Sequence, residues 1–193
     1  MADLDITPRS TALVLIDLQK GIVARQTAPH SSADVVKEAA RLADAFRSGA
    51  AKIVLVHVVF SRDDRDRLSP KVDSAPPGGP TPPDYGEIVK ELGPKPNDIV
   101  VTKRQWGAFY GTDLDLQLRR RRIDTIVLGG ISTNFGVEST GRSAWEHGYQ
   151  VVFVEDAMAG MTEEAHNFAI KTIFPRIGLV RSTEQVLAAI NAR

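Results

Sequence analysis

Three stretches of this sequence place groups that could do acid–base chemistry at or directly after apolar runs. Asp17 ends the run TALVLID (11–17), and Lys103 ends DIVVTK (98–103). A buried carboxylate or ammonium group is costly unless it has a partner or a role. The third stretch, GGISTNFG (129–136), combines glycines with small polar residues and leads into a helical pattern, so it can aim backbone N–H groups at one point. An acid, a base and backbone donors could therefore converge at one rim of the fold.

These positions require strands that end on the same side of one sheet. Short runs rich in β-branched residues are apolar at nearly every position, which is typical of strands covered on both faces. They lie at 11–17, 52–60, 98–103, 124–130 and 149–156, with a weaker sixth run at 177–181. Helical patterns separate them, at 31–50, 112–122, 134–148, 162–174 and 182–193. The alternation predicts a three-layer α/β/α sandwich with a six-stranded parallel sheet, whose ligands bind beyond the carboxyl ends of the strands.

Composition narrows the class of protein. A chain of 193 residues with 42% hydrophobic content predicts one domain over 1–193. The 24 basic residues balance the 24 acidic ones, which argues against nucleic acid or an anionic membrane as a partner. Cysteine is absent, so disulfides, thiolate metal sites and cysteine catalysis are excluded. The polar N-terminus and the short apolar run after it predict neither a signal peptide nor a membrane span, and we expect a cytoplasmic protein.

Asp17 and Lys103 each have a structural alternative. The aspartate could cap a turn after its strand, and the lysine could lie on the surface. The glycine-rich turn favours the functional interpretation, since all three features fall at predicted strand ends. The residues alone predict a pocket that holds Asp17 and Lys103 and leave its reaction open.

Over nearly its whole length, the chain resembles the isochorismatase-like hydrolase family, which includes nicotinamidases and N-carbamoylsarcosine amidohydrolases. Its motifs occur in the expected order, from ALVLIDLQKG through VTKRQWGAFYG to VLGGISTNFGVEST and VVFVEDAMAG. The resemblance implies a Rossmann-like fold, with Asp17 as the acid/base residue and Lys103 as its lysine partner. It also implies a cis peptide bond between Ile131 and Ser132, and backbone donors at Ser132 and Gly136.

Gly136 stands where most members of this family carry the nucleophilic cysteine. Amide hydrolysis in the family proceeds through a thioester, which glycine cannot form. The isochorismatase branch lacks that cysteine and hydrolyses a vinyl ether with an aspartic acid as proton donor. We therefore expect a hydrolase of a small carboxylate-bearing molecule that works without a covalent cysteine intermediate. The alternative is a catalytically silent small-molecule-binding protein that retains the pocket.

Other chemistry is less well supported by the sequence. Ser132 lacks the G-x-S-x-G pattern of a nucleophile elbow, because Asn134 stands where the second glycine belongs, and no histidine lies nearby in sequence. The four histidines form no metal-binding spacing, so we expect neither a metal nor a cofactor.

Several side chains are candidates for substrate binding. Aromatic rings could wall a pocket for a flat molecule, although they could equally be core or subunit-interface residues. Loop arginines could bind a substrate carboxylate, although most loop arginines are solvated. The candidates are Gln19, Arg62, Trp106, Phe109, Tyr110 and Phe135, with Arg65, Arg67 and Arg104 as further possible anchors. The segment 61–96, rich in proline, glycine and charge, is either a loop over the site or a mobile excursion. By resemblance to the family we also expect a homo-oligomer, a dimer or a tetramer.

Overall fold

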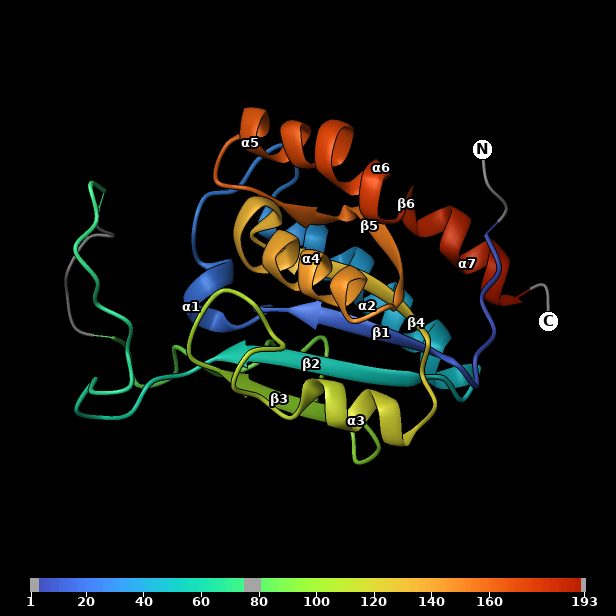
Figure 1. Cartoon of the computed structure of the whole chain (residues 1–193), viewed down its shortest axis with the longest axis horizontal. Coiled ribbons are helices and arrows are strands. Elements are labelled where there is room, and N and C mark those ends of the chain that lie inside the picture. The colour runs from blue at the N-terminus through green and yellow to red at the C-terminus, as the bar shows by residue number, and fades with distance from the viewer. Residues whose placement is uncertain (1–3, 75–80, 192–193) are drawn as a thin grey trace.

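Six parallel strands form the central sheet in the computed structural model of the protein, which describes residues 4–74 and 81–191 (Figure 1). The strands are β1 (Thr11–Ile16), β2 (Lys52–Val58), β3 (Ile99–Lys103), β4 (Thr125–Ile131), β5 (Gln150–Ala159) and β6 (Leu179–Arg181). Their order across the sheet is β3-β2-β1-β4-β5-β6. The predicted six-stranded parallel sheet is confirmed. β5 runs three residues further than predicted, because Met158 and Ala159 pair with the end of β4.

Helices cover both faces of this sheet. They are α1 (Lys20–Val23), α2 (Ser32–Ser48), α3 (Leu114–Arg120), η1 (Thr133–Val137), α4 (Glu138–Glu146), α5 (Glu163–Phe168), η2 (Ala169–Ile173), α6 (Phe174–Ile177) and α7 (Thr183–Asn191). Leu13 and Leu15 of β1 pack in one core with α2 and α7. Val14 and Ile16 pack in the other core with α3, α4 and α6. Both sides of the strand are therefore buried, which explains its continuous apolar run and confirms the three layers.

The order of the strands reverses between β1 and β4, and this point determines where the site forms. β1 pairs with β2 on one side and with β4 on the other, so the segments after β1 and β4 diverge at a crevice. Gly130 lies opposite Ile16 at this point, with φ of 125°, and a Cβ built on it would lie 2.1 Å from the carbonyl oxygen of Ile16. The register of β4 against β5 also shifts between Leu128 and Gly130. The two strand ends can approach closely because residue 130 has no side chain.

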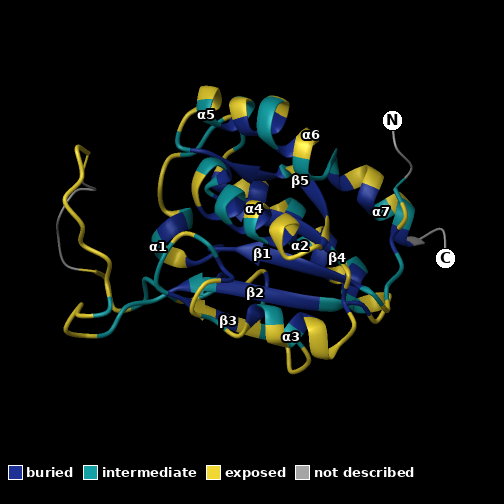
Figure 2. Cartoon of the chain, viewed as in Figure 1, coloured by how far each residue is buried: buried dark blue, intermediate teal, exposed yellow. Residues whose placement is uncertain are grey.

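The long connection between β2 and β3 has two parts. Residues 61–74 extend away from the body of the protein and are largely exposed (Figures 1 and 2). The returning part lies against the chain after β1: Gly21 and Lys20 donate backbone hydrogen bonds to Tyr85 and Glu87, and Gln19 bridges Ile88 in an antiparallel arrangement. The predicted loop is thus an excursion followed by a segment that packs beside the strand ends. Residues 75–80 of the predicted loop lie outside the described residues.

We predict that Gly130→Ala destabilises the fold much more than Gly148→Ala does. Both glycines have positive φ, at 125° and 82°, but a Cβ on Gly148 meets nothing within 4 Å, whereas one on Gly130 collides with the backbone of β1. Gly148→Ala should cost about 1 kcal/mol from backbone strain, and Gly130→Ala at least about 3 kcal/mol. Urea unfolding of both variants measures the difference, and equal losses would contradict the close approach of β1 and β4.

Candidate active site

Asp17 and Lys103 form a buried ion pair beyond the carboxyl ends of the strands. Asp17 directly follows β1 with φ of 53°, an uncommon left-handed conformation for a residue other than glycine, and its N–H donates to the carbonyl oxygen of Val56. Lys103, the last residue of β3, donates from Nζ to Oδ2 of Asp17 at 2.7 Å and to the carbonyl oxygen of Gln105 at 3.0 Å. The two residues are 6% and 2% exposed. The structure thus brings together the acid and the base predicted from separate strand ends.

The carboxyl group of Asp17 is poised between its two protonation states. Burial raises the pKa of Asp17 from 3.8 to about 6, because loss of solvation outweighs the opposing effects of the Lys103 ammonium group and the Arg25 guanidinium. Oδ2 accepts the hydrogen bond from Lys103, whereas the buried Oδ1 has no hydrogen-bond partner among the described residues. A protonated carboxyl at this position would therefore carry its proton on Oδ1, with the pairing to Lys103 preserved.

The glycine-rich turn after β4 lies against this carboxyl group. The peptide bond between Ile131 and Ser132 is cis, as the resemblance predicted. A Cβ built on Gly136 would lie 3.2 Å from Oδ2 of Asp17 and 2.9 Å from Cγ2 of Ile16. The N–H of Ser132 donates no hydrogen bond within the described part of the chain. Residue 136 therefore faces the acid, and its missing side chain lets the turn pack this closely against Asp17 and Ile16.

Buried side-chain hydrogen bonds hold this turn in place. Thr140, on the first turn of α4, donates its hydroxyl proton to the carbonyl oxygen of Gly136 at 2.7 Å and accepts from the N–H of Ala108 at 3.1 Å. Thr133 bonds to Nδ1 of His166 at 2.9 Å, and burial lowers the pKa of that histidine to about 4. His166 is thus a neutral packing partner of the turn at physiological pH.

Two predicted substrate-binding residues, Gln19 and Phe109, lie in the interior of the fold. Gln19 is fully buried: its amide nitrogen donates to the carbonyl oxygens of Val58 and Tyr85, and its Oε1 accepts from the N–H of Val58. Phe109 is 7% exposed and stacks on the ring of His147. It belongs to the hydrophobic core in which α3 packs on the sheet. Gln19 ties together the segments beside the site, and Phe109 is a packing residue.

The other predicted binding residues lie at the surface. Trp106 and Phe135 form an exposed aromatic pair with ring centroids 4.7 Å apart. Phe135 directly precedes Gly136 in the chain, and the carbonyl oxygen of Trp106 would lie 3.5 Å from a Cβ built on Gly136. The pair therefore lies at the surface beside the glycine-rich turn. Tyr110 is 85% exposed, and Arg62 is also exposed; no interaction within the described part of the chain draws either side chain to Asp17.

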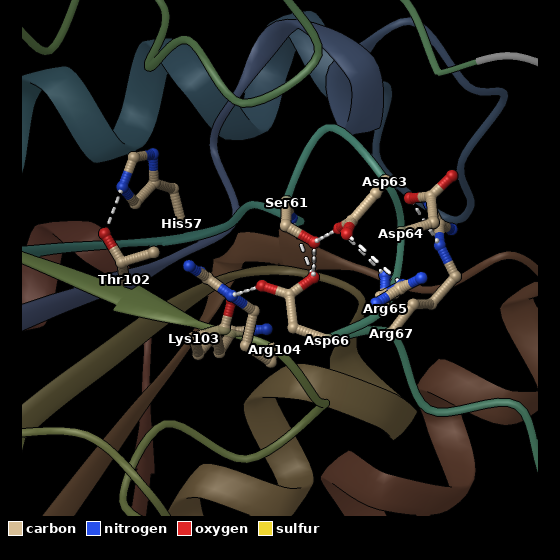
Figure 3. A network of polar contacts seen from close by, with 10 residues as sticks. All are labelled: His57, Ser61, Asp63, Asp64, Arg65, Asp66, Arg67, Thr102, Lys103 and Arg104. Carbon is tan, nitrogen blue, oxygen red and sulfur yellow. Dashed lines mark hydrogen bonds and ion pairs between the residues drawn. The ribbon is translucent and has the colours of Figure 1, made fainter.

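The remaining loop arginines are held by aspartates of the excursion. Arg104 pairs with Asp66, whose carboxylate also accepts from Ser61 (Figure 3). Arg67 pairs with Asp64 and lies over the ring of Phe60, and Arg65 pairs with Asp63. Figure 3 shows this polar network beside Lys103, at the base of the excursion. These three arginines are thus already engaged by carboxylates of the chain itself.

Sequence reasoning missed two residues around the turn that follows β1, Tyr85 and Arg25. The ring of Tyr85 lies on Gly21, where a built Cβ would be only 2.0 Å from Cδ2 of the tyrosine. Arg25 is an exposed residue just beyond the end of α1, and its charge lowers the pKa of both Asp17 and Tyr85. No local pattern indicates Tyr85, because its place depends on how a distant segment packs.

Other features of the surface offer no comparable chemistry. One open hollow of about 720 Å³ lies at the amino ends of β4 and β5, and another of about 510 Å³ lies beside β2 and β3. Neither is lined by a buried aspartate, glutamate, lysine or arginine. Across residues 4–74 and 81–191, no three side chains of histidine, aspartate or glutamate gather as a metal site requires. No helix in these ranges is both long and apolar enough to cross a bilayer.

A parallel α/β domain with a buried acid–lysine pair at the switch point of its sheet is the arrangement of an isochorismatase-like hydrolase. The family model for the isochorismatase domain matches residues 11–185, and the chain belongs to this family. The uncharacterised isochorismatase family protein YecD of Escherichia coli O157:H7 is 49% identical over 187 residues, which cover 97% of this chain and all of that protein.

Two further comparisons extend this result. An isochorismatase family protein from Burkholderia thailandensis has a solved structure that matches with a TM-score of 0.93 and 46% identity, over 97% of this chain and 98% of that one. A protein of Pseudomonas chlororaphis that bears the name "Probable isochorismatase" is 28% identical, over 97% of this chain and 89% of its own length.

We predict that Asp17 makes the stability of the fold depend on pH between about 4 and 6. The pKa of Asp17 in the folded state exceeds its ordinary value, so the folded protein binds more protons in this range and loses stability as the pH rises. The difference between 3.8 and about 6 corresponds to about 3 kcal/mol. The free energy of unfolding of the wild type, minus that of Asp17→Asn, should therefore fall by up to about 3 kcal/mol from pH 4 to pH 7. A difference that stays constant in urea titrations across this range would show that Asp17 ionises normally.

Proposed function

We propose that this isochorismatase-family protein hydrolyses a vinyl ether in a small carboxylate-bearing substrate, with Asp17 as the general acid. The observation that carries the proposal is the buried, unpartnered Oδ1 of a carboxyl group with a pKa of about 6, with the bare backbone of Gly136 packed against the same carboxyl group. An acid with this pKa can hold a transferable proton near neutral pH.

The reaction requires only a proton donor and water. Asp17 transfers the proton from Oδ1 to the terminal methylene carbon of the enol ether, which becomes a methyl group and leaves an oxocarbenium ion. Water adds to this cation and returns a proton to Asp17. The resulting hemiketal breaks its bond to the alkoxy group, which leaves as the alcohol, while the remaining carbons form pyruvate. The enzyme and the acid are regenerated, and one water molecule is consumed.

Lys103 serves this chemistry through its contact with Oδ2. Its ammonium nitrogen lies 2.7 Å from Oδ2 and so fixes the orientation of the carboxyl group. The same contact stabilises the carboxylate that remains after proton transfer. The N–H groups of Ser132 and Gly136 are the candidate donors to a substrate oxygen, and Trp106 with Phe135 is the candidate wall for a flat ring. These roles are parts of the proposal.

Gly136 argues against the amide-hydrolysing chemistry of other family members. Without a thiol at this position no thioester can form, and the sequence contains no cysteine that could replace it. The proposed reaction involves no cofactor and no metal. We further propose a cytoplasmic homo-oligomer, consistent with the exposure of Trp106 and Phe135 beside the site.

We predict that the purified protein releases pyruvate from isochorismate or a related enolpyruvyl ether, as followed by a lactate dehydrogenase-coupled assay. Asp17→Asn keeps the size of the side chain and an acceptor for Lys103 but has no acidic proton, so kcat should fall by about 10³-fold or more. Circular dichroism checks that the variant folds. An equally active Asn variant would remove Asp17 from the acid role.

The same preparation should release no ammonia from nicotinamide. Ligand-dependent thermal stabilisation without turnover of any enolpyruvyl ether would instead support the silent binding protein. Ammonia release would contradict the exclusion of amide hydrolysis.

We predict that Gly136→Ala lowers the same activity by about tenfold or more. The added methyl group would lie 2.9 Å from Ile16 and 3.2 Å from Asp17, so it must displace the acid or push the turn away from it. Gly107→Ala is the matched control, because its Cβ meets Ser139 at an ordinary 3.6 Å. Equal rates for the two variants would show that activity does not need the close packing of Gly136 against Asp17.

A further inference from the structure

The glycine-rich turn is anchored by side chains from two helices, and one of these side chains has no part in the proposed reaction. Thr140 anchors the carbonyl oxygen of Gly136 from within the helix that the turn enters, at a spacing of four residues. The second anchor comes from α5, where His166 bonds to Thr133, 33 residues earlier in the chain. Thr133 directly follows Ser132, so this bond acts on the residue next to the cis peptide.

Both partners of this second anchor are buried. Thr133 is fully buried, and His166 is 3% exposed. Oγ1 of the threonine and Nδ1 of the histidine lie 2.9 Å apart, an ordinary hydrogen-bond length. Because water does not reach either group freely at this depth, removal of one partner leaves the other unsatisfied. The bond therefore favours one arrangement of the turn over others in which the hydroxyl group has no partner.

The chain at the start of α5 also packs against the turn. Gly160 directly follows β5, and its backbone pairs with that of Ala28 through hydrogen bonds of 3.0 and 2.9 Å. A Cβ built on Gly160 would lie 3.3 Å from Oδ1 of Asn134 and 3.4 Å from the backbone nitrogen of His166. Since Asn134 directly follows Thr133, two successive residues of the turn meet this part of the chain. The histidine thus projects from a backbone that is itself fixed.

We propose that His166 is a positioning residue of the site, which acts through Thr133 to fix the backbone of the turn against Asp17. The turn carries the N–H groups of Ser132 and Gly136, and Gly136 packs against the Asp17 carboxyl group. A hydroxyl group held by the histidine ring limits rotation of the peptide units on either side of it. The inference rests on the proposed function for the reaction that the turn serves, and His166 takes no part in the proton transfer.

The first test separates positioning from substrate binding, with pyruvate release from an enolpyruvyl ether as the assay. Thr133→Val removes the hydroxyl group and His166→Leu removes the ring nitrogen. Each should lower kcat about 10- to 100-fold and change KM by less than about threefold, because the turn is displaced and substrate still binds. His166→Asn keeps a polar atom at the place of Nδ1 and should recover most of the lost rate.

The two changes combined report whether both act through one bond. The double variant of Thr133→Val and His166→Leu should be no slower than the slower single variant, because both changes remove the same interaction. Wild-type kcat in either single variant, or losses that multiply in the double variant, would overturn the inference.

Thr183→Val is the matched control for the loss of a buried hydroxyl group. Thr183 is also fully buried, at the start of α7, and its Oγ1 donates to Oδ1 of Asp156 at 2.8 Å. This variant should unfold at a lower urea concentration, as Thr133→Val does, yet keep the wild-type kcat. If Thr183→Val is as slow as Thr133→Val, a general loss of stability explains both and the inference is overturned.

The second test does not depend on the reaction. The N–H groups of Phe135 and Val137 both donate to the carbonyl oxygen of Ser132 at 3.2 Å, so their hydrogen–deuterium exchange, followed by NMR, reports how firmly the turn is held. Exchange should be about tenfold faster or more in Thr133→Val and His166→Leu, and unchanged in the Thr183 control.

Exchange at the wild-type rate in Thr133→Val and His166→Leu would overturn the inference. Faster exchange in these variants of a protein that hydrolyses no enolpyruvyl ether would sustain the role of His166 in fixing the turn while contradicting the proposed reaction.

Discussion

The contact between the Lys103 ammonium group and the Asp17 carboxyl group is the interaction on which the geometry of the site depends. Two ionisable groups in a nearly dry environment require each other, because either one left unpaired would carry a large desolvation penalty. The pair joins the end of β3 to the end of β1 across β2, three strands that are fixed by backbone hydrogen bonds. The position of the acid is thus determined by the sheet, and no flexible loop has to hold it.

The pair also explains how an acid and a base can share one site without cancelling each other. A close ammonium group favours the carboxylate, yet burial has the larger effect and keeps the pKa of Asp17 near 6. Since the lysine contacts only Oδ2, the opposite oxygen stays available. Gly130 makes this arrangement possible by letting β4 approach β1, which brings the backbone of the turn at Gly136 against the same carboxyl group.

The sequence predicted these features to different degrees, for physical reasons. Continuous apolar runs identified strands buried on both faces, and in a parallel sheet all strand ends of one kind meet at one edge, so Asp17 and Lys103 could be placed together. The burial of Gln19 could not be predicted, because its amide donates to carbonyl groups of Val58 and Tyr85, 39 and 66 residues away. Such long-range partners leave no local pattern. The same holds for Tyr85, whose position follows from the docking of the returning segment on Gly21.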